Sequence, residues 1–298
     1  MRSVWLGVTS ILMALVCCGV SLAEDESDFQ PKPIDRLFLT PCGKVLPSMD
    51  VNLTLGGAYG TMNRGEYLGI AAVGLGNVAE LEISTWRLVS NFLRGTMALG
   101  TSSLKISIIR ETQQMPSVAL AFRSNPSWAK METSGRDLTS AVSATVSEVS
   151  FETHFASLYL AVTKQIFSGT SINAGVSLTD MRTRAGQAIL TTTPQFNTFP
   201  NHQENLPGGF FGFTRQVNPR TMVMGEVSTI PRYSYNPVNN NLSIDQVASV
   251  IAGFRFYFSP HFSTDAGVKY RTDYAGIADA EISVGLNVGF NVQDLMKK

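Results

Sequence analysis

The chain has 298 residues, of which 44% are hydrophobic and 15% are charged, and its formal net charge is zero. The charged fraction is well below the roughly 25% of ordinary soluble domains. Because positive and negative charges balance, composition gives no electrostatic reason to expect binding to nucleic acid or to an anionic surface.

The first 23 residues have the pattern of a secretory signal peptide. Met1-Arg2 is a short basic start, the run from Val4 to Val20 is apolar, and Ser21-Leu22-Ala23 forms a small-x-small cleavage site. A membrane anchor is the alternative, but the short run and the cleavage site argue against it. Two of the three cysteines lie in this leader, so Cys42 remains alone and cannot form an internal disulfide.

Residues 24–46 are acidic at first and then rich in proline, with Pro31, Pro33 and Pro41. This composition predicts an extended segment ahead of the first regular element. A small plug is the alternative, and the sequence contains no specific signal for it.

From residue 47 to residue 292 the chain repeats short segments in which apolar and polar residues alternate. Alternation with a period of two is typical of strands that have one apolar face. We expect about twelve strands, within a range of 10–14. They are centred on residues 49–55, 68–72, 79–84, 103–108, 118–122, 154–162, 172–178, 210–216, 222–229, 250–258, 264–271 and 282–292.

The connections between these strands alternate in length. They are short after strands two, six, eight and ten, and long after strands five, seven and nine, over residues 124–150, 180–208 and 231–242. Short periplasmic turns and long extracellular loops in this order are typical of a transmembrane barrel. A soluble β-sandwich is the runner-up, and it has no reason to place its long loops on one side only.

The last expected strand, residues 282–292, places apolar residues on one face and small uncharged polar residues on the other. Within it, Ser283, Gly285, Val288 and Phe290 match the terminal-strand signal of bacterial outer-membrane β-barrel proteins, which the sequence thus resembles. The family usually stops at the aromatic residue, whereas this chain continues for eight residues. The resemblance implies recognition by the barrel-assembly machinery, outer-membrane lipid as a partner, and residence in the cell outer membrane after signal-peptide cleavage.

The expected fold is therefore all-β, a transmembrane antiparallel up-and-down β-barrel. The expected division is a signal peptide at 1–23, a periplasmic N-terminal segment at 24–46, the barrel at 47–292 and a C-terminal tail at 293–298.

Eight charged residues fall in the inward phase of the expected strands. An inward position is favoured because Lys or Arg on the lipid face at mid-depth costs about 2–4 kcal/mol. One interpretation is that acids and bases pair to fill the lumen of a small barrel, and the other is that they line a polar conduit. These lumen-lining candidates are Asp50, Glu80, Glu82, Lys105, Arg255, Asp265, Lys269 and Arg271.

Other motifs give little indication of chemistry. Gly74-Leu-Gly76-Asn-Val-Ala79 has dinucleotide-binding spacing, but the residues after it alternate like a strand, so we interpret it as a hairpin turn. No pair of histidines has metal-ligand spacing, and we expect neither a metal nor a cofactor. His154 is the one candidate for catalysis, as part of a lipid-cutting Ser-His pair, but no serine partner can be named.

These observations predict a narrow porin-like passive conduit for small polar solutes, with no enzymatic activity and no nucleic-acid partner. The alternative is a closed structural or loop-receptor barrel, with a link to envelope or exopolysaccharide export. That link is suggested because Met115–Arg123 and Ala156–Lys164 resemble hairpins of exopolysaccharide-export barrels. An outer-membrane lipid-modifying enzyme is a minor alternative.

Overall fold

The structure is a computed structural model, and it describes residues 29–32, 36–60, 63–90, 96–135, 138, 140–191 and 196–296. The expected signal peptide lies outside the described residues. Among these residues, no helix combines the length and apolar character needed to cross a membrane.

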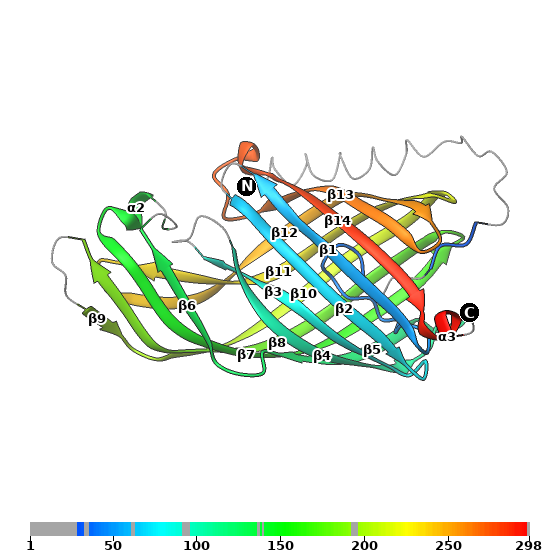
Figure 1. The fold of residues 1–298 in the computed structure, drawn as a ribbon, viewed down its shortest axis with the longest axis horizontal. Coiled ribbons are helices and arrows are strands. Elements are labelled where there is room, and N and C mark those ends of the chain that lie inside the picture. Colours follow the sequence, from blue (N-terminus) through cyan, green and yellow to red (C-terminus); the bar gives the residue numbers. More distant parts are fainter. Residues whose placement is uncertain are drawn as a thin grey trace.

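Twelve antiparallel strands form a closed ring (Figure 1). Each strand pairs with the next along the chain, and β1 closes the ring by pairing with β14 from Asp50↔Asn291 to Tyr59↔Ile282. The expected up-and-down barrel of twelve strands is confirmed. The ring consists of β1 (Asp50–Gly60), β2 (Asn63–Leu75), β3 (Ala79–Ser90), β4 (Thr96–Ile109), β5 (Ser117–Ser124), β7 (Val146–Phe167), β8 (Thr170–Leu190), β10 (His202–Asn218), β11 (Thr221–Asn236), β12 (Asn241–Ser259), β13 (Phe262–Arg271) and β14 (Glu281–Asn291).

The alternation in β14 shows why these residues form a wall. Ile282 is 62% exposed on the outer face, whereas Asn287 is 2% exposed on the inner face. The same division runs through β1, where Leu55 faces outward and Thr54 faces inward and bonds Asn287 across the strand pair. Strands with this pattern turn their polar side chains into the lumen and leave an apolar outer surface.

The two ends of the barrel differ. The short connections and the two ends of the ring, Asp50 and Asn291, lie at one end, which we call the turn end. At the other end, the extended end, several strands continue far beyond the ring, on the left in Figure 1. The ladder between β11 and β12, for example, continues to Asn236↔Asn241.

The long connections expected at this end are therefore built largely of strand. Residues 124–150 contain β6 (Ala129–Ser134), α2 (Ser140–Ser143) and the start of β7. Residues 180–208 contain the end of β8, β9 (Phe196–Phe199) and the start of β10. Extra rungs satisfy backbone N–H and C=O groups that a loop would leave to water. The two remaining short elements are η1 (Ile277–Asp279) and α3 (Val292–Met296).

An apolar core fills the extended end. Phe151 and Tyr233 meet edge to face with their ring centroids 5.0 Å apart, and the Tyr233 hydroxyl bonds Thr153. Packing of this kind excludes water, so this end is closed by apolar side chains. The buried members are Leu99, Leu138, Val142, Val146, Val149, Phe151, Phe155, Met181, Ala188, Phe199, Leu206, Tyr233, Tyr235, Leu242 and Ile244.

Candidate functional site: the barrel interior

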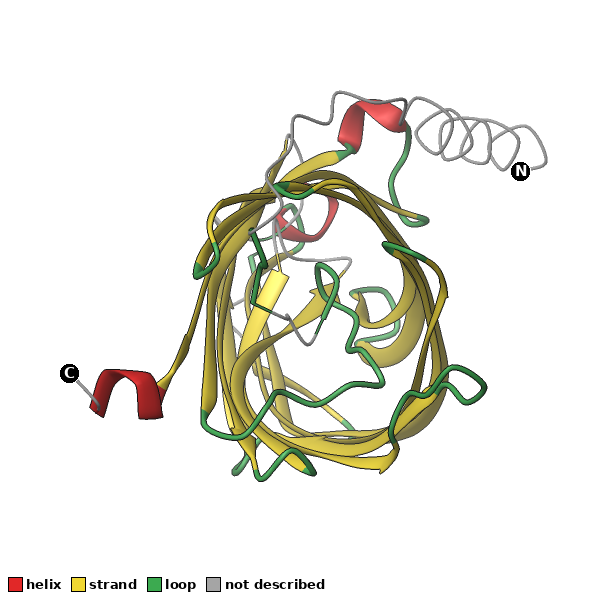
Figure 2. Cartoon of the chain, turned by 90° about the vertical axis from the view of Figure 1, so that its right-hand side faces the viewer, coloured by secondary structure: helices red, strands yellow, loops and turns green. Residues whose placement is uncertain are grey.

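The described part of the N-terminal segment, residues 29–32 and 36–48, runs through the turn-end half of the ring, and we call it the plug. Figure 2 looks into the barrel and shows loop lying across the space that the strands enclose. The plug starts where the Phe29 ring contacts Tyr257 and the Lys32 N–H donates to Pro260 O, and it ends before β1 begins at Asp50. The segment expected as an extended lead-in thus lies, over this part, inside the wall.

One carboxylate of the wall holds the centre of the plug. Glu226, on the inner face of β11, accepts hydrogen bonds from the backbone N–H groups of Phe38, Leu39 and Thr40, all at 3.1 Å, and from the Thr40 hydroxyl at 2.9 Å. Three successive N–H groups directed at one anion form a concave anion site of the kind that phosphates and carboxylates occupy. Four donors of the plug converge on this one side chain, so Glu226 is the main anchor of the plug.

Other polar wall residues bond the backbone of the plug on either side of this anchor. Arg255 donates to Leu37 O at 3.0 Å, Thr163 accepts from Gly43 N at 2.7 Å, and Glu80 accepts from Leu46 N at 3.0 Å.

Inward-facing glycines make room for the plug. A Cβ on Gly212 would lie 2.5 Å from a Leu37 methyl carbon, and one on Gly267 would lie 3.1 Å from the Phe38 ring. A Cβ on Gly74 would lie only 1.9 Å from Pro47 O. Glycine in a strand often marks such a close approach of another backbone.

All eight lumen-lining candidates are buried, and each has an ion-pair partner. Two of the partners, Lys32 and Arg36, come from the plug, which the sequence did not place there. The pairs are Asp50–Lys32 at 3.3 Å, Glu80–Lys105 at 3.0 Å, Glu82–Arg36 at 2.9 Å, Glu82–Arg123 at 3.0 Å, Arg255–Asp265 at 2.6 Å, Lys269–Glu281 at 3.2 Å and Arg271–Asp273 at 3.0 Å. Pairing accounts for the burial of these charged side chains, and it also ties the plug to the wall.

A hollow of about 840 Å³ lies on the turn-end side of the plug, between it, the β2–β3 turn and the walls of β4, β5 and β7. Glu111 sits at its rim, where it pairs with Lys44 of the plug at 2.6 Å and accepts the Gln165 N–H at 2.6 Å. Burial alone raises the pKa of Glu111, but the Gln165 N–H and the Lys44 ammonium outweigh it. The pKa of this carboxyl therefore lies below its ordinary value of 4.5.

This lowered pKa predicts an acid-sensitive contribution to stability. A carboxylate with a depressed folded-state pKa stabilises the fold above its unfolded pKa, and that contribution is lost as the pH falls through the folded value. Glu111→Gln should cost about 1 kcal/mol of unfolding free energy at neutral pH. The difference from the wild type should shrink as the pH falls below 4.5. Denaturant unfolding at several pH values measures it, and the exposed Glu204→Gln is the control; a difference independent of pH would contradict the assignment.

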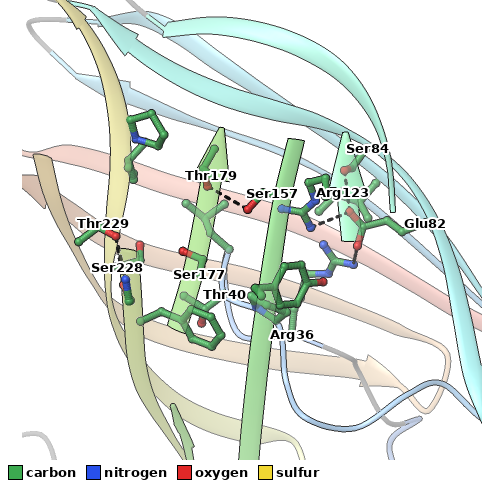
Figure 3. A pocket seen from close by; sticks show the side chains of 18 of the residues that line it. Arg36, Thr40, Glu82, Ser84, Arg123, Ser157, Ser177, Thr179, Ser228 and Thr229 are labelled. Atoms are coloured by element: carbon green, nitrogen blue, oxygen red, sulfur yellow. Dashed lines mark hydrogen bonds and ion pairs between the residues drawn. The ribbon is translucent and has the colours of Figure 1, made fainter. Parts of the chain in front are cut away.

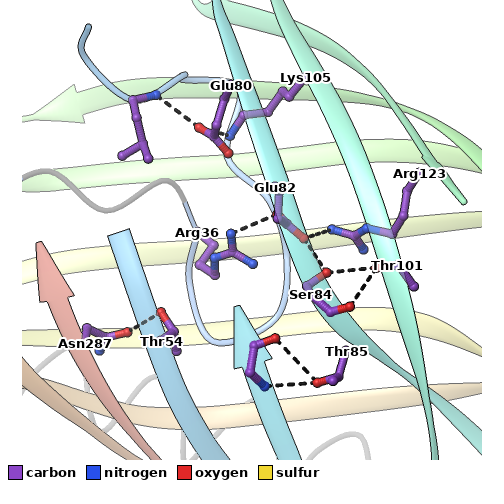
Figure 4. A network of polar contacts seen from close by, with 12 residues as sticks. Arg36, Thr54, Glu80, Glu82, Ser84, Thr85, Thr101, Lys105, Arg123 and Asn287 are labelled. Atoms are coloured by element: carbon purple, nitrogen blue, oxygen red, sulfur yellow. Dashed lines mark hydrogen bonds and ion pairs between the residues drawn. The ribbon is translucent and has the colours of Figure 1, made fainter. Parts of the chain in front are cut away.

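A second, smaller cavity of about 130 Å³ lies on the other side of the plug, between it and the extended-end core (Figure 3). Its charged members are Arg36, Glu82 and Arg123, with both arginines bonded to the one carboxylate (Figure 4). Ser84 and Thr101 continue this polar network along β3 and β4. The lining also includes the apolar side chains of Leu68, Ile70 and Phe210, and hydroxyl groups from β7, β8 and β11.

The wall beside this cavity is incomplete in two places. The β10–β11 ladder runs from the turn end only as far as Phe210↔Ser228, and the β2–β3 ladder only to Ile70↔Ser84, although all four strands continue. We call these positions the β10–β11 seam and the β2–β3 seam. Beyond them β3 pairs in parallel with β11 through Arg232↔Val89 and Tyr233↔Ser90, so the wall folds across the lumen.

Each seam is held at its last rung by a threonine hydroxyl. Thr229 accepts from Gly209 N at 3.0 Å and donates to Gly209 O at 3.4 Å. Thr85 does the same with Gly69, at 2.9 Å and 3.5 Å. A side chain therefore replaces a backbone rung at both positions, which makes each seam a weak point of the ladder.

Glu226, Arg36 and Arg123 were missed by the sequence reasoning, for different reasons. Arg123 directly follows outward-facing Phe122, so the alternation of β5 could have placed it inside. Glu226 belongs to a hairpin whose facing the sequence did not determine, because apolar residues occupy both phases of it. Arg36 lies in the proline-rich segment, which has no periodicity.

The remaining sequence candidates lie in two strands of the wall. In β14, Ser283 and Gly285 are in the inward phase while Val288 and Phe290 are in the outward phase; their role in assembly stays a prediction. His154 lies in β7, and its ring packs at a tilt against that of Trp128, with the ring centroids 5.6 Å apart. Within the described residues, no cluster of three or more His, Cys, Asp or Glu side chains could hold a metal ion.

The sequence matches no family model and no curated protein. Solved structures match over most of the chain. The translocator domain of autotransporter NalP from Neisseria meningitidis aligns with a TM-score of 0.50 and 12% identity, covering 81% of this chain and 87% of that one. The NanC porin aligns at 0.41 and 8%, covering 81% and 100%, and the Pseudomonas putida toluene transporter TodX at 0.32 and 8%, covering 80% and 87%. The chain thus has the fold of bacterial outer-membrane β-barrels.

Proposed function

We propose that the protein is an outer-membrane barrel that acts as a passive conduit for small polar solutes and is held closed by its plug. The carrying observation is that Glu226 anchors the plug by accepting hydrogen bonds from four donors, with a hollow on each side of the plug. The proposal includes no catalytic step.

The way in which the lumen is filled supports this proposal over a permanently solid barrel. The described strands of the ring pair with one another, and the plug adds no rung to their ladders. Its departure would break hydrogen bonds and ion pairs to the wall, but it would remove no rung from the strand ladders. A segment that can leave without unfolding the barrel is a suitable gate, because loops and lids that move are the least stable parts of a fold.

The apolar core at the extended end favours a second candidate, a closed structural or receptor barrel. Fifteen buried apolar residues close that end independently of the plug. If they never separate, release of the plug opens a dead-end space. The two candidates therefore predict different conductances once the plug is released.

Conductance in planar bilayers tests the proposal. The wild type should be closed for most of the recording, whereas Glu226→Ala, which removes the shared acceptor of four donors, should show discrete conductance steps. Glu204→Ala, on the same hairpin but exposed, is the matched control and should behave like the wild type. A gel mobility that shifts on boiling verifies folding. If folded Glu226→Ala is as silent as the wild type, the conduit is wrong and the closed barrel is favoured.

A further inference from the structure

The charged residues that line the 130 Å³ cavity carry one positive charge in excess. Among the described residues that line it, two arginines and one glutamate are charged. Glu82 is shared, because its two carboxylate oxygens accept from Arg36 at 2.9 Å and from Arg123 at 3.0 Å. The Arg123 Nε is buried and has no hydrogen-bond partner. A guanidinium with an unused donor beside a shared counterion is suited to a second carboxylate.

Apolar side chains from β2, β10 and β11 form a second part of the cavity lining. Ile70 and Ile230 are buried there, and the Phe210 ring packs edge to face against Tyr159 with 6.5 Å between centroids. The Tyr159 ring also lies under the Arg123 guanidinium, with its centroid 5.7 Å from the guanidinium carbon, so it lies between the charged and the apolar parts of the lining. The inward positions are therefore not all polar at this level, because β2, β10, β11 and the plug contribute apolar side chains.

Size and access limit what the cavity could hold. Its volume of about 130 Å³ is close to that of cavities that accept a benzene ring. Its lining includes both seam threonines, Thr85 and Thr229, so it reaches the wall at both seams. Outward residues beside the seams are apolar: Ile83 is 65% exposed, and Val176, paired with Gly209, is 61% exposed. An apolar body could approach from the side at either position.

We propose that this cavity is a binding site for a small organic carboxylate with a compact apolar body. The carboxylate lies against Arg123 and Arg36, and the apolar body lies against Ile70, Phe210 and Ile230. The claim that such carboxylates are the solutes of the conduit rests on the proposed function. The claim that they bind in the cavity depends only on the cavity. Desolvated pockets that combine an apolar wall with a few placed polar groups are typical small-molecule sites.

Three probes of equal size and different charge test the site on the folded, detergent-solubilised full chain. Calorimetric titration should show that benzoate binds, that benzyl alcohol binds more weakly, and that benzylammonium does not bind at the same concentrations. Arg123→Gln should weaken benzoate binding about tenfold and leave benzyl alcohol within about twofold, since only the charged hydrogen bond is removed. Arg182→Gln, an exposed arginine paired with Asp180, is the control and should change neither.

A second pair of variants keeps the test decisive if Arg123→Gln fails to fold. Ile70→Trp should fill the cavity and abolish binding of both benzoate and benzyl alcohol, whereas Leu81→Trp, on the outer face of the neighbouring strand and away from the seams, should leave both unchanged. Equal affinity for benzoate and benzylammonium, or benzoate binding unaffected by Ile70→Trp, overturns the site. Because binding is measured without a bilayer, selective binding by a protein that never conducts refutes the conduit alone, and conduction without binding refutes the site alone.

Discussion

Arg255→Met is expected to lower the free energy of unfolding by about 3–5 kcal/mol. Arg255 and Asp265 face each other across β12 and β13, joined by two hydrogen bonds of 2.6 Å and 2.9 Å, and both are buried. Removing the guanidinium leaves an uncompensated carboxylate in the wall and also deprives Leu37 O of its donor. Both losses follow from one substitution, which is why the effect is large.

Urea unfolding in detergent, followed by tryptophan fluorescence, measures this loss. The double variant Arg255→Met/Asp265→Leu should recover most of it, because a buried ion pair replaced on both sides by apolar groups is often near neutral. Arg232→Met is the matched control: its pair with Asp245 is partly exposed and should be worth at most about 1 kcal/mol. A single-variant cost no greater than that of the control would show that the Arg255 pair is solvated and not part of a closed interior.

The wall was predictable from the sequence because each strand carries its own evidence. Leu104, Ile106 and Ile108 alternate with Ser103, Lys105 and Ser107, and the structure exposes the first set outside while burying Ser103 and Lys105 inside. A period of two fixes which face each side chain takes, and a shift of one residue would reverse the whole strand. At most wall positions the local alternation therefore predicts correctly whether a side chain faces outward or into the lumen.

The filling of the lumen was not predictable in the same way. The N–H groups of Phe38, Leu39 and Thr40 are bonded by Glu226, which lies more than 180 residues away in the sequence. The plug is bound largely through its backbone groups, so its side chains need not follow any periodic pattern that the sequence could reveal. The seams are equally hidden, since Thr85 and Thr229 are ordinary strand residues until their partners are known to be Gly69 and Gly209.

Glycines at inward positions of the strands could have indicated that another segment lies against the wall. Gly74 follows the inward phase of Ile70 and Ala72, where a small residue leaves an empty volume unless something fills it. In the structure that volume is occupied by the backbone of Leu46 and Pro47. The spacing alone could not show whether a plug, a solvated lumen or a neighbouring side chain takes the space.

Gly74→Ala is expected to loosen the plug and to expose Cys42. The new Cβ would lie 1.9 Å from Pro47 O and 2.6 Å from Leu46 O, and both are backbone atoms that must move. Overpacking of this kind costs about 1–3 kcal/mol, which corresponds to a 5- to 150-fold change in an opening equilibrium. Cys42 is buried in the plug, and after removal of the expected signal peptide it is the only cysteine of the chain. Its rate of reaction with a maleimide therefore reports plug opening, and it should rise by about tenfold or more.

Gly69→Ala is the matched control, because it lies on the same strand and a Cβ there would meet no atom within 4 Å. In this control Cys42 should react at the wild-type rate. In Glu226→Ala it should react faster, because the plug loses the shared acceptor of its four donors. If Gly74→Ala and Gly69→Ala react equally slowly while Glu226→Ala conducts, the plug opens only around Glu226 and its end near Pro47 stays fixed. If all three react as the wild type does, the segment is a permanent part of the barrel. The two seams are then the candidate gates, because a threonine hydroxyl replaces a backbone hydrogen-bond pair at each of them.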